Sequence, residues 1–99
     1  MRIAAIQYIN TLPLIFGLQN RTDHDLILDT PSACFRKLIS NEVDVALIPV
    51  WGTQMQPEVR AIPHLGIAAL NQTESVFVYS PKPLNRIQTV AVDPASLTS

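Results

Sequence analysis

The fold is decided by residues 26–50, which have the sequence LILDTPSACFRKLISNEVDVALIPV. The apolar stretches 26–28 and 43–50 are each typical of a buried strand. Between them, Thr30 and Pro31 are typical of a helix start, with a capping residue followed by proline at the first helical position. A strand, a helix and a strand in this order predict a parallel βαβ unit with a right-handed crossover. Apolar residues at nearly every position of 43–50 further predict a central strand of the sheet.

A strand and a helix are predicted before this unit. Residues 2–8 are apolar and β-prone, and they predict a buried strand. Asn10 and Thr11 are predicted to cap the following helix, and Pro13 falls in its first turn, where the missing N–H does no harm. Further strands are predicted over 62–70, 75–80 and 89–92. We expect one α/β domain over residues 1–99, with a mainly parallel sheet flanked by helices, because 99 residues leave no room for two domains.

Composition excludes several classes of partner. Apolar residues make up 47% of the chain, which is enough for a packed core. Seven basic and eight acidic residues give a net charge of -1, so nucleic acid and an anionic membrane surface are not expected as partners. No apolar run approaches the roughly 20 residues of a membrane span. The first residues lack the pattern of a signal peptide, so we expect a cytoplasmic protein.

Polar residues gather where the predicted strands end. In parallel sheets, ligands bind beyond the carboxyl ends of the strands, and the polar segments there are 8–11, 29–32, 49–52 and 93–99. Asn10 and Thr11 lie at a strand-to-helix junction, where free helical N–H groups favour an anion. One interpretation is carboxylate binding, with Tyr8 or Asn10 donating a hydrogen bond. The other is a plain helix cap, and the residues alone leave both open.

Two further segments offer hydroxyl groups to a ligand. Ser75 opens the predicted strand 75–80, and it either contacts a ligand or ends a turn. Near the end of the chain, Ser96 and Thr98 stand where they would cap a helix and cradle a carboxylate. The chain ends before that helix, so we expect a truncated protein.

Other polar residues have structural explanations. Cys34 falls in an apolar helical pattern and is expected to be a buried thiol. Asp44 is expected to stand at a strand start and to pair with a backbone donor. His24 and His64 are isolated, so we expect no metal site. The chain has three glycines and lacks the glycine-rich phosphate-binding motifs, so no cofactor is expected.

Residues 8–14, Tyr-Ile-Asn-Thr-Leu-Pro-Leu, resemble the opening of the menaquinone-biosynthesis proteins that include chorismate dehydratase. Residues 42–49 resemble the family's Gly-Glu-x-Asp-Val-Ala stretch. Gly-Ile-Ala at 66–68, Ser75-Val76 and the ending Ser-x-Thr-Ser within 93–99 complete a resemblance along the whole chain. The chain departs from the family at Asn41 (usually Gly), Gln7 (frequently Ser), Val50-Trp51 and Leu97.

The resemblance implies the N-terminal lobe of a type II periplasmic-binding-protein-like fold, in a cytoplasmic enzyme without a cofactor. It implies a lyase of the futalosine route to menaquinone that dehydrates chorismate to 3-[(1-carboxyvinyl)oxy]benzoate. Asn10 and Ser75 match the catalytic positions nearest the substrate ring. Substrate-binding positions fall at Tyr8, Thr11, Ser96, Thr98 and Ser99, the last two of which hold a carboxylate at the start of the second lobe.

The family is much longer than 99 residues. We therefore expect truncation at the crossover between the lobes, and little activity from the isolated chain. One alternative is a non-catalytic lobe that binds a small carboxylate, as in solute-binding proteins. Another is a lobe that associates with a second copy through its exposed face and so rebuilds a cleft.

Overall fold

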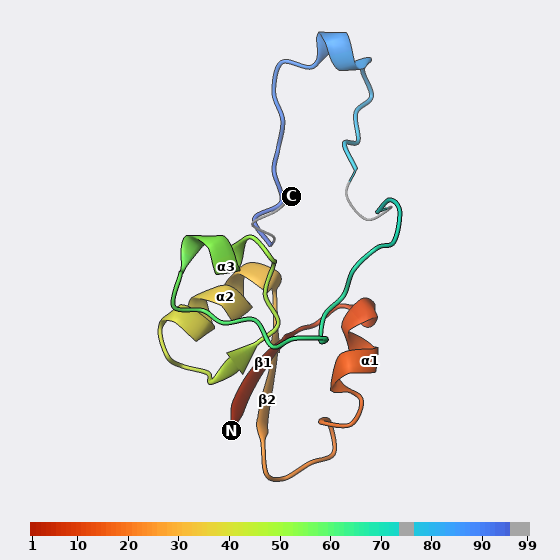
Figure 1. Cartoon of the computed structure of the whole chain (residues 1–99). Coiled ribbons are helices and arrows are strands. Elements are labelled where there is room, and N and C mark those ends of the chain that lie inside the picture. Colours follow the sequence, from red (N-terminus) through yellow and green to blue (C-terminus); the bar gives the residue numbers. More distant parts are fainter. Residues whose placement is uncertain (74–76, 96–99) are drawn as a thin grey trace.

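The computed structural model describes residues 1–73 and 77–95. Figure 1 shows the course of the chain through these residues. The elements are β1 (Arg2–Ile6), the 3-10 turn η1 (Ile9–Thr11), α1 (Leu12–Ile15), β2 (Asp25–Asp29), α2 (Pro31–Ile39), β3 (Val45–Ala46), α3 (Gly52–Met55) and the 3-10 turn η2 (Leu84–Arg86). No helix among the described residues has the length and apolar character needed to cross a membrane.

The sheet has three parallel strands in the order β2-β1-β3. In its register, Ile3 of β1 stands opposite Leu26 of β2 and Val45 of β3. The predicted parallel βαβ arrangement is thus confirmed, but the expectation that 43–50 supplies the central strand is wrong. β1 is central, and the segment 43–50 forms a short edge strand. The ladder ends after the bond from Leu47 N–H to the Ala4 carbonyl (2.8 Å), because Pro49 has no N–H to extend it.

Helices cover the sheet on both sides. Figure 1 places α2 and α3 on one side of β1 and β2, and α1 on the other. On the α2 side, the buried core consists of Ala4, Cys34 and Val43, with Ile6, Leu38, Ala46 and Ile48 packed around it. The alternate residues of β1, Ile3 and Ala5, are also buried. The central strand therefore contributes to packing on both faces, as a buried parallel strand should.

Both ends of α2 follow from local sequence. Thr30 caps the amino end, where its hydroxyl oxygen accepts a hydrogen bond from Ala33 N–H (3.4 Å), and Pro31 opens the first turn. At the carboxyl end, Asn41 N–H donates to the Leu38 carbonyl and Glu42 N–H to the Lys37 carbonyl. This is the Schellman pattern, which requires a left-handed residue after the helix. Asn41 supplies it with a φ of 60°.

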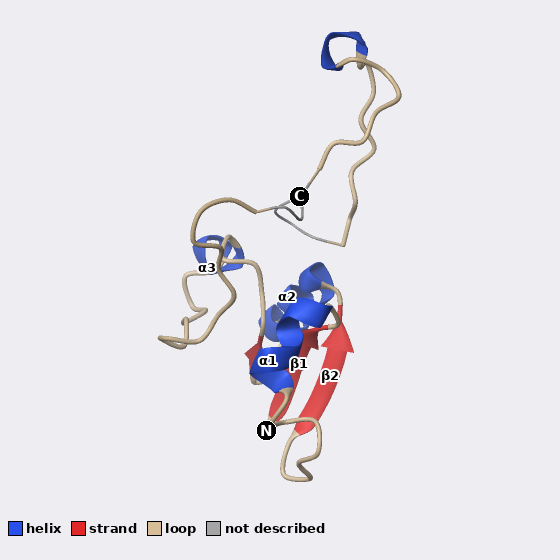
Figure 2. Ribbon diagram, turned by 90° about the vertical axis from the view of Figure 1, so that its right-hand side faces the viewer, coloured by secondary structure: helices blue, strands red, loops and turns tan. Residues whose placement is uncertain are grey.

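Residues 70–73 and 77–93, which we call the arm, project from this body. The arm carries η2 at its tip, and its length makes the molecule 53 × 26 × 22 Å (Figures 1 and 2). The strands predicted over 62–70 and 89–92 do not form, nor does the described part, 77–80, of the strand predicted over 75–80. These segments are apolar, but none of them pairs with the sheet, and a strand needs a neighbour for its backbone groups. Phe77, Val78 and Tyr79 are consequently exposed.

Candidate functional site

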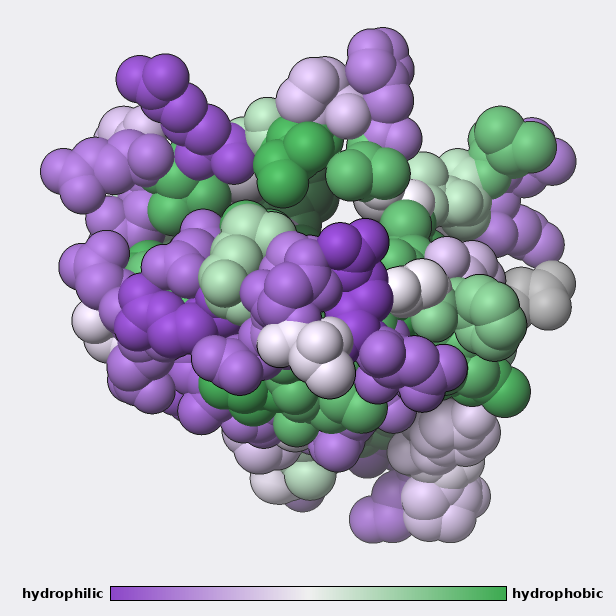
Figure 3. Space-filling view, turned by 90° about the horizontal axis from the view of Figure 1, so that it is seen from below, coloured by the Kyte–Doolittle hydropathy of each residue, from purple (hydrophilic) through white to green (hydrophobic). Residues whose placement is uncertain are grey.

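A cleft of about 1130 Å³ borders the sheet. Its walls come from β1, from the turn η1 and α1, from β3 and the residues after it, and from the loop that follows α3. Most of the lining is apolar, and includes Ile3, Ala5, Ile15, Ile62, Leu65 and Ile67. Apolar walls with a few polar groups are typical of small-molecule sites. The view from below in Figure 3 shows mostly hydrophilic side chains with apolar patches between them.

Tyr8, Asn10 and Thr11 all line this cleft. They follow the end of β1, which is held in place because Gln7 N–H donates to the Asp29 carbonyl at the end of β2 (3.0 Å). Tyr8 has an extended backbone, and the 3-10 turn η1 then reverses the chain over three residues. The carboxyl end of the central strand therefore brings these three predicted site residues together.

Thr11 is fully buried, and its hydroxyl has no hydrogen-bond partner among the described residues. The plain helix cap predicted at this junction is absent. Thr11 occupies the capping position of α1, but its side chain makes no capping bond, because its backbone is already helical (φ -81°, ψ -22°) whereas a capping residue is typically extended. An unpaired buried hydroxyl costs about 1–3 kcal/mol, so a ligand group that reached it would gain from pairing with it.

Asn10 and Tyr8 differ from Thr11 in that both side chains are exposed. Tyr8 is 43% exposed, and the polar groups of both residues are accessible to a ligand in the cleft. An amide, a phenol and an aliphatic hydroxyl are all hydrogen-bond donors to a carboxylate. The other predicted site residues, Ser75, Ser96, Thr98 and Ser99, lie outside the described residues.

Arg60 is a cleft residue that sequence reasoning missed. It is exposed and forms no ion pair within residues 1–73 and 77–95. A guanidinium is well suited to a carboxylate, because it offers two parallel N–H donors. No motif in the sequence marks Arg60, since it reaches the cleft through the irregular loop after α3 rather than from a strand end.

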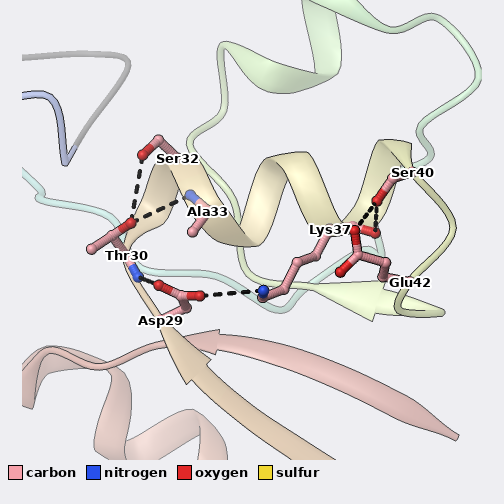
Figure 4. A network of polar contacts seen from close by, with 7 residues as sticks. All are labelled: Asp29, Thr30, Ser32, Ala33, Lys37, Ser40 and Glu42. Carbon is pink, nitrogen blue, oxygen red and sulfur yellow. Dashed lines mark hydrogen bonds and ion pairs between the residues drawn. The ribbon is translucent and has the colours of Figure 1, made fainter.

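The polar network around α2 is structural. The Asp29 carboxylate accepts a hydrogen bond from Thr30 N–H (2.8 Å) and pairs with the Lys37 ammonium at 3.5 Å (Figure 4). The Thr30 N–H, together with the cation of Lys37, lowers the pKa of Asp29. The network anchors the first turn of the helix to the strand before it, so these residues position the end of β2 and are not free to bind a ligand.

Two structural predictions about single residues are confirmed. Asp44 accepts a hydrogen bond from the backbone N–H of Arg2 (2.7 Å). Cys34 is a buried thiol, and burial raises its pKa to about 11, so the reactive thiolate is disfavoured at neutral pH. Within residues 1–73 and 77–95, no cluster of three or more His, Cys, Asp or Glu side chains is arranged to hold a metal ion.

Comparison with known proteins identifies the family to which the chain belongs. Neither the curated proteins nor the solved structures contain a match to this chain. A family model described as menaquinone biosynthesis matches residues 1–99, the whole of the chain. This match confirms the resemblance seen in residues 8–14 and 42–49. The chain therefore belongs to the menaquinone biosynthesis family.

Proposed function

We propose that this chain forms one side of a chorismate dehydratase site. Family membership indicates a role in menaquinone biosynthesis, and the dehydration of chorismate is the step that the residues of the cleft support best. The observation that carries the proposal is the convergence of Tyr8, Asn10 and Thr11 on one apolar cleft, with the Thr11 hydroxyl buried and unpaired. A cyclic dicarboxylate needs such a site, with apolar walls for its ring and donors for its carboxylates.

The reaction suits a site that is rich in donors. Chorismate loses a ring hydrogen and a neighbouring hydroxyl as water, and the ring becomes aromatic. Aromatisation drives the elimination strongly, so positioning the substrate and holding its carboxylates supply most of the catalysis. None of Tyr8, Asn10 and Thr11 is a strong base at neutral pH. The proton then passes to a water that Asn10 polarises or to the substrate's own carboxylate.

The proposed roles follow from chemistry and exposure. The exposed Asn10 amide contacts the reacting part of the ring, together with Ser75. Tyr8 and Thr11 bind substrate oxygen atoms, and Arg60 attracts a carboxylate from the loop side of the cleft. Ser96, Thr98 and Ser99 hold the other carboxylate, and the cytoplasmic location expected from the resemblance belongs to the same proposal.

A second candidate is a lobe that binds a small carboxylate without changing it. The observation in its favour is that the polar groups where β1 ends are hydrogen-bond donors rather than bases. Both candidates share the ligand class, and they differ only in whether product forms.

The deciding experiment measures binding and turnover on the same samples. Chorismate is titrated calorimetrically into the chain and into the longest product of its gene, and loss of water is followed by mass spectrometry. Binding with loss of water supports the dehydratase. Binding without it, in both proteins, supports the second candidate. If Asn10→Ala leaves turnover unchanged, its catalytic role is wrong, and if neither protein binds chorismate, both candidates are wrong.

A further inference from the structure

Residues 94 and 95, which follow the arm, lie at the start of α2, where Ser32 binds both of them. Ser32 N–H donates to the Ala95 carbonyl (3.1 Å), and the Ser32 hydroxyl donates to the Pro94 carbonyl (3.2 Å). Ser32 and Pro94 are 62 residues apart in the chain. Ser32 is only 4% exposed, so the donor side of both bonds is shielded from water, whereas Pro94 is exposed. Figure 1 shows this return of the chain beside α2.

The bond to Ala95 completes the hydrogen bonding at the amino end of α2. A helix leaves its first four N–H groups without partners inside the helix. Here Thr30 N–H donates to the Asp29 carboxylate and Ala33 N–H to the Thr30 hydroxyl oxygen, while Pro31 has no N–H (Figure 4). Ser32 N–H is the donor for which this local sequence offers no acceptor. The distant Ala95 carbonyl supplies that acceptor.

The segment that Ser32 binds is itself a shaped turn. Asp93 accepts a hydrogen bond from Ala95 N–H through its carboxylate (2.9 Å), which closes an Asx-type turn around Pro94. Proline restricts the backbone of that turn further, so the two carbonyl groups face Ser32 with little freedom. We call residues 93–95 the docking turn.

We propose that Ser32 is a positioning residue for the proposed substrate site. By holding the docking turn against α2, it fixes the point from which the chain continues to Ser96, Thr98 and Ser99. The inference rests on the proposed function, because that proposal assigns those three hydroxyls to the substrate. Ser32 itself touches no substrate in this scheme. Its contribution is to place the docking turn at the same carboxyl edge of the sheet as the end of β1.

Amide hydrogen exchange, followed residue by residue by NMR, tests the docking. In the wild-type chain we expect protection of the amide of residue 32, because Ser32 N–H donates to the Ala95 carbonyl, and Ser32→Ala should raise exchange at this amide about fivefold, which is the loss typical of one hydrogen bond. Ser32→Thr keeps the hydroxyl and should restore protection. The matched control is Ser40→Ala, at the other end of α2, where the hydroxyl bonds Lys37 and Glu42 and the docking turn should not respond.

A second variant tests the contact between Ser32 and the docking turn by changing the docking turn. Asp93→Ala opens the docking turn without altering α2, and should raise exchange at Ser32 even if Ser32→Ala folds poorly. An unprotected Ser32 amide in the wild-type chain would overturn the docking. So would unchanged exchange in both variants.

Chorismate affinity tests the consequence for the site. Ser32→Ala and Asp93→Ala should each weaken binding about fivefold, with rescue by Ser32→Thr and no change in Ser40→Ala. Loss of docking with unchanged affinity overturns the positioning role and leaves the proposed function intact. Absence of chorismate binding by the wild-type chain contradicts the proposed function, and with it the role of Ser32 toward the substrate. The exchange data still decide whether the turn docks.

Discussion

Arg2 holds the Asp44 carboxylate with both its backbone and its side chain. Asp44 Oδ2 accepts from the Arg2 backbone N–H at 2.7 Å, and Oδ1 accepts from Arg2 Nη2 at 2.7 Å. Arg2 begins the central strand, and Asp44 directly precedes β3. The Arg2 carbonyl also accepts from Asp44 N–H at 2.9 Å. The pair therefore sets the register of the edge strand at its first residue.

This pair predicts loss of stability in acid. The Arg2 guanidinium and N–H lower the pKa of Asp44 to about 2, whereas an unfolded Asp titrates near about 4. Because the folded pKa is the lower one, the stabilisation is complete above about pH 4 and is lost as the pH falls through about 2. Melting temperatures of the wild-type chain and Asp44→Asn should differ at pH 7 and converge near pH 2. A difference that persists at pH 2 would contradict this role, and Glu58→Gln is a control at an exposed carboxylate.

Replacing Asn41 with Ala and replacing it with Gly should have different effects on the free energy of unfolding. Its φ of 60° costs an L-residue about 1–2 kcal/mol, less for Asn than for most, and nothing for Gly. Asn41→Ala is expected to lower the free energy of unfolding by about 1 kcal/mol, and Asn41→Gly to preserve or raise it. Urea denaturation measures both. Equal stability of the two variants would mean that the left-handed turn does not form.

Gly52 is required by close packing. A Cβ at this position would lie 2.9 Å from Cδ2 of Phe35 and 3.1 Å from Cδ1 of Ile48. Both neighbours pack in the interior, so Gly52→Ala is expected to cost about 1–3 kcal/mol in denaturation experiments. The matched control is Gly17→Ala, because no atom lies within 4 Å of a Cβ there. Similar costs for the two variants would rule out the packing explanation.

Thr11 should show opposite effects on stability and binding. Thr11→Val replaces an unpaired buried hydroxyl with a methyl group of the same shape, so we expect stability to rise by about 1 kcal/mol. Chorismate affinity should fall about tenfold, measured by calorimetry, if the hydroxyl pairs with the ligand. Thr53→Val is the control, since the Thr53 hydroxyl already donates to the Val50 carbonyl (2.7 Å), and there stability should fall. Unchanged affinity in Thr11→Val would remove Thr11 from the site.

The arm should promote self-association. Phe77, Tyr79 and Val90 are 56%, 87% and 62% exposed, and such apolar surfaces are uncommon in monomers. Size-exclusion chromatography with light scattering, at several concentrations, is expected to show a second copy binding. Phe77→Lys and Val90→Lys should weaken that association without changing the sheet. A strict monomer at all concentrations would exclude it.

Structural features that depend only on neighbouring residues could be predicted well from the sequence. Thr30 and Pro31 act within one helical turn, and the start of α2 follows from them directly. The strand order does not follow in this way, because the apolar run 43–50 is compatible with a central strand and with an edge strand packed against helices on both faces. Phe77 to Tyr79 have strand-like side chains but no neighbouring strand, and pairing is a property of two segments rather than one.

In the candidate site, too, the residues that a local pattern marks were predictable, and the residues brought in from elsewhere in the chain were not. Tyr8, Asn10 and Thr11 were predictable because parallel topology carries the polar end of a strand to a ligand edge. Arg60 comes from an irregular loop, so neither periodicity nor a motif marks it. The contact between Ser32 and Ala95 joins residues on distant parts of the chain, and no local pattern encodes it.

The short sequence span of the sheet has a consequence for synthesis on the ribosome. Every strand pairing that the described residues form lies within residues 2–46, so the sheet and its first helix can form while the arm is still being translated. The docking turn follows the sheet in the chain and closes a long loop onto a surface that is already folded, which limits the entropy lost to the loop itself. Variants of the sheet should therefore change the yield of this early folding step, whereas variants of the docking turn should act only after the sheet has formed.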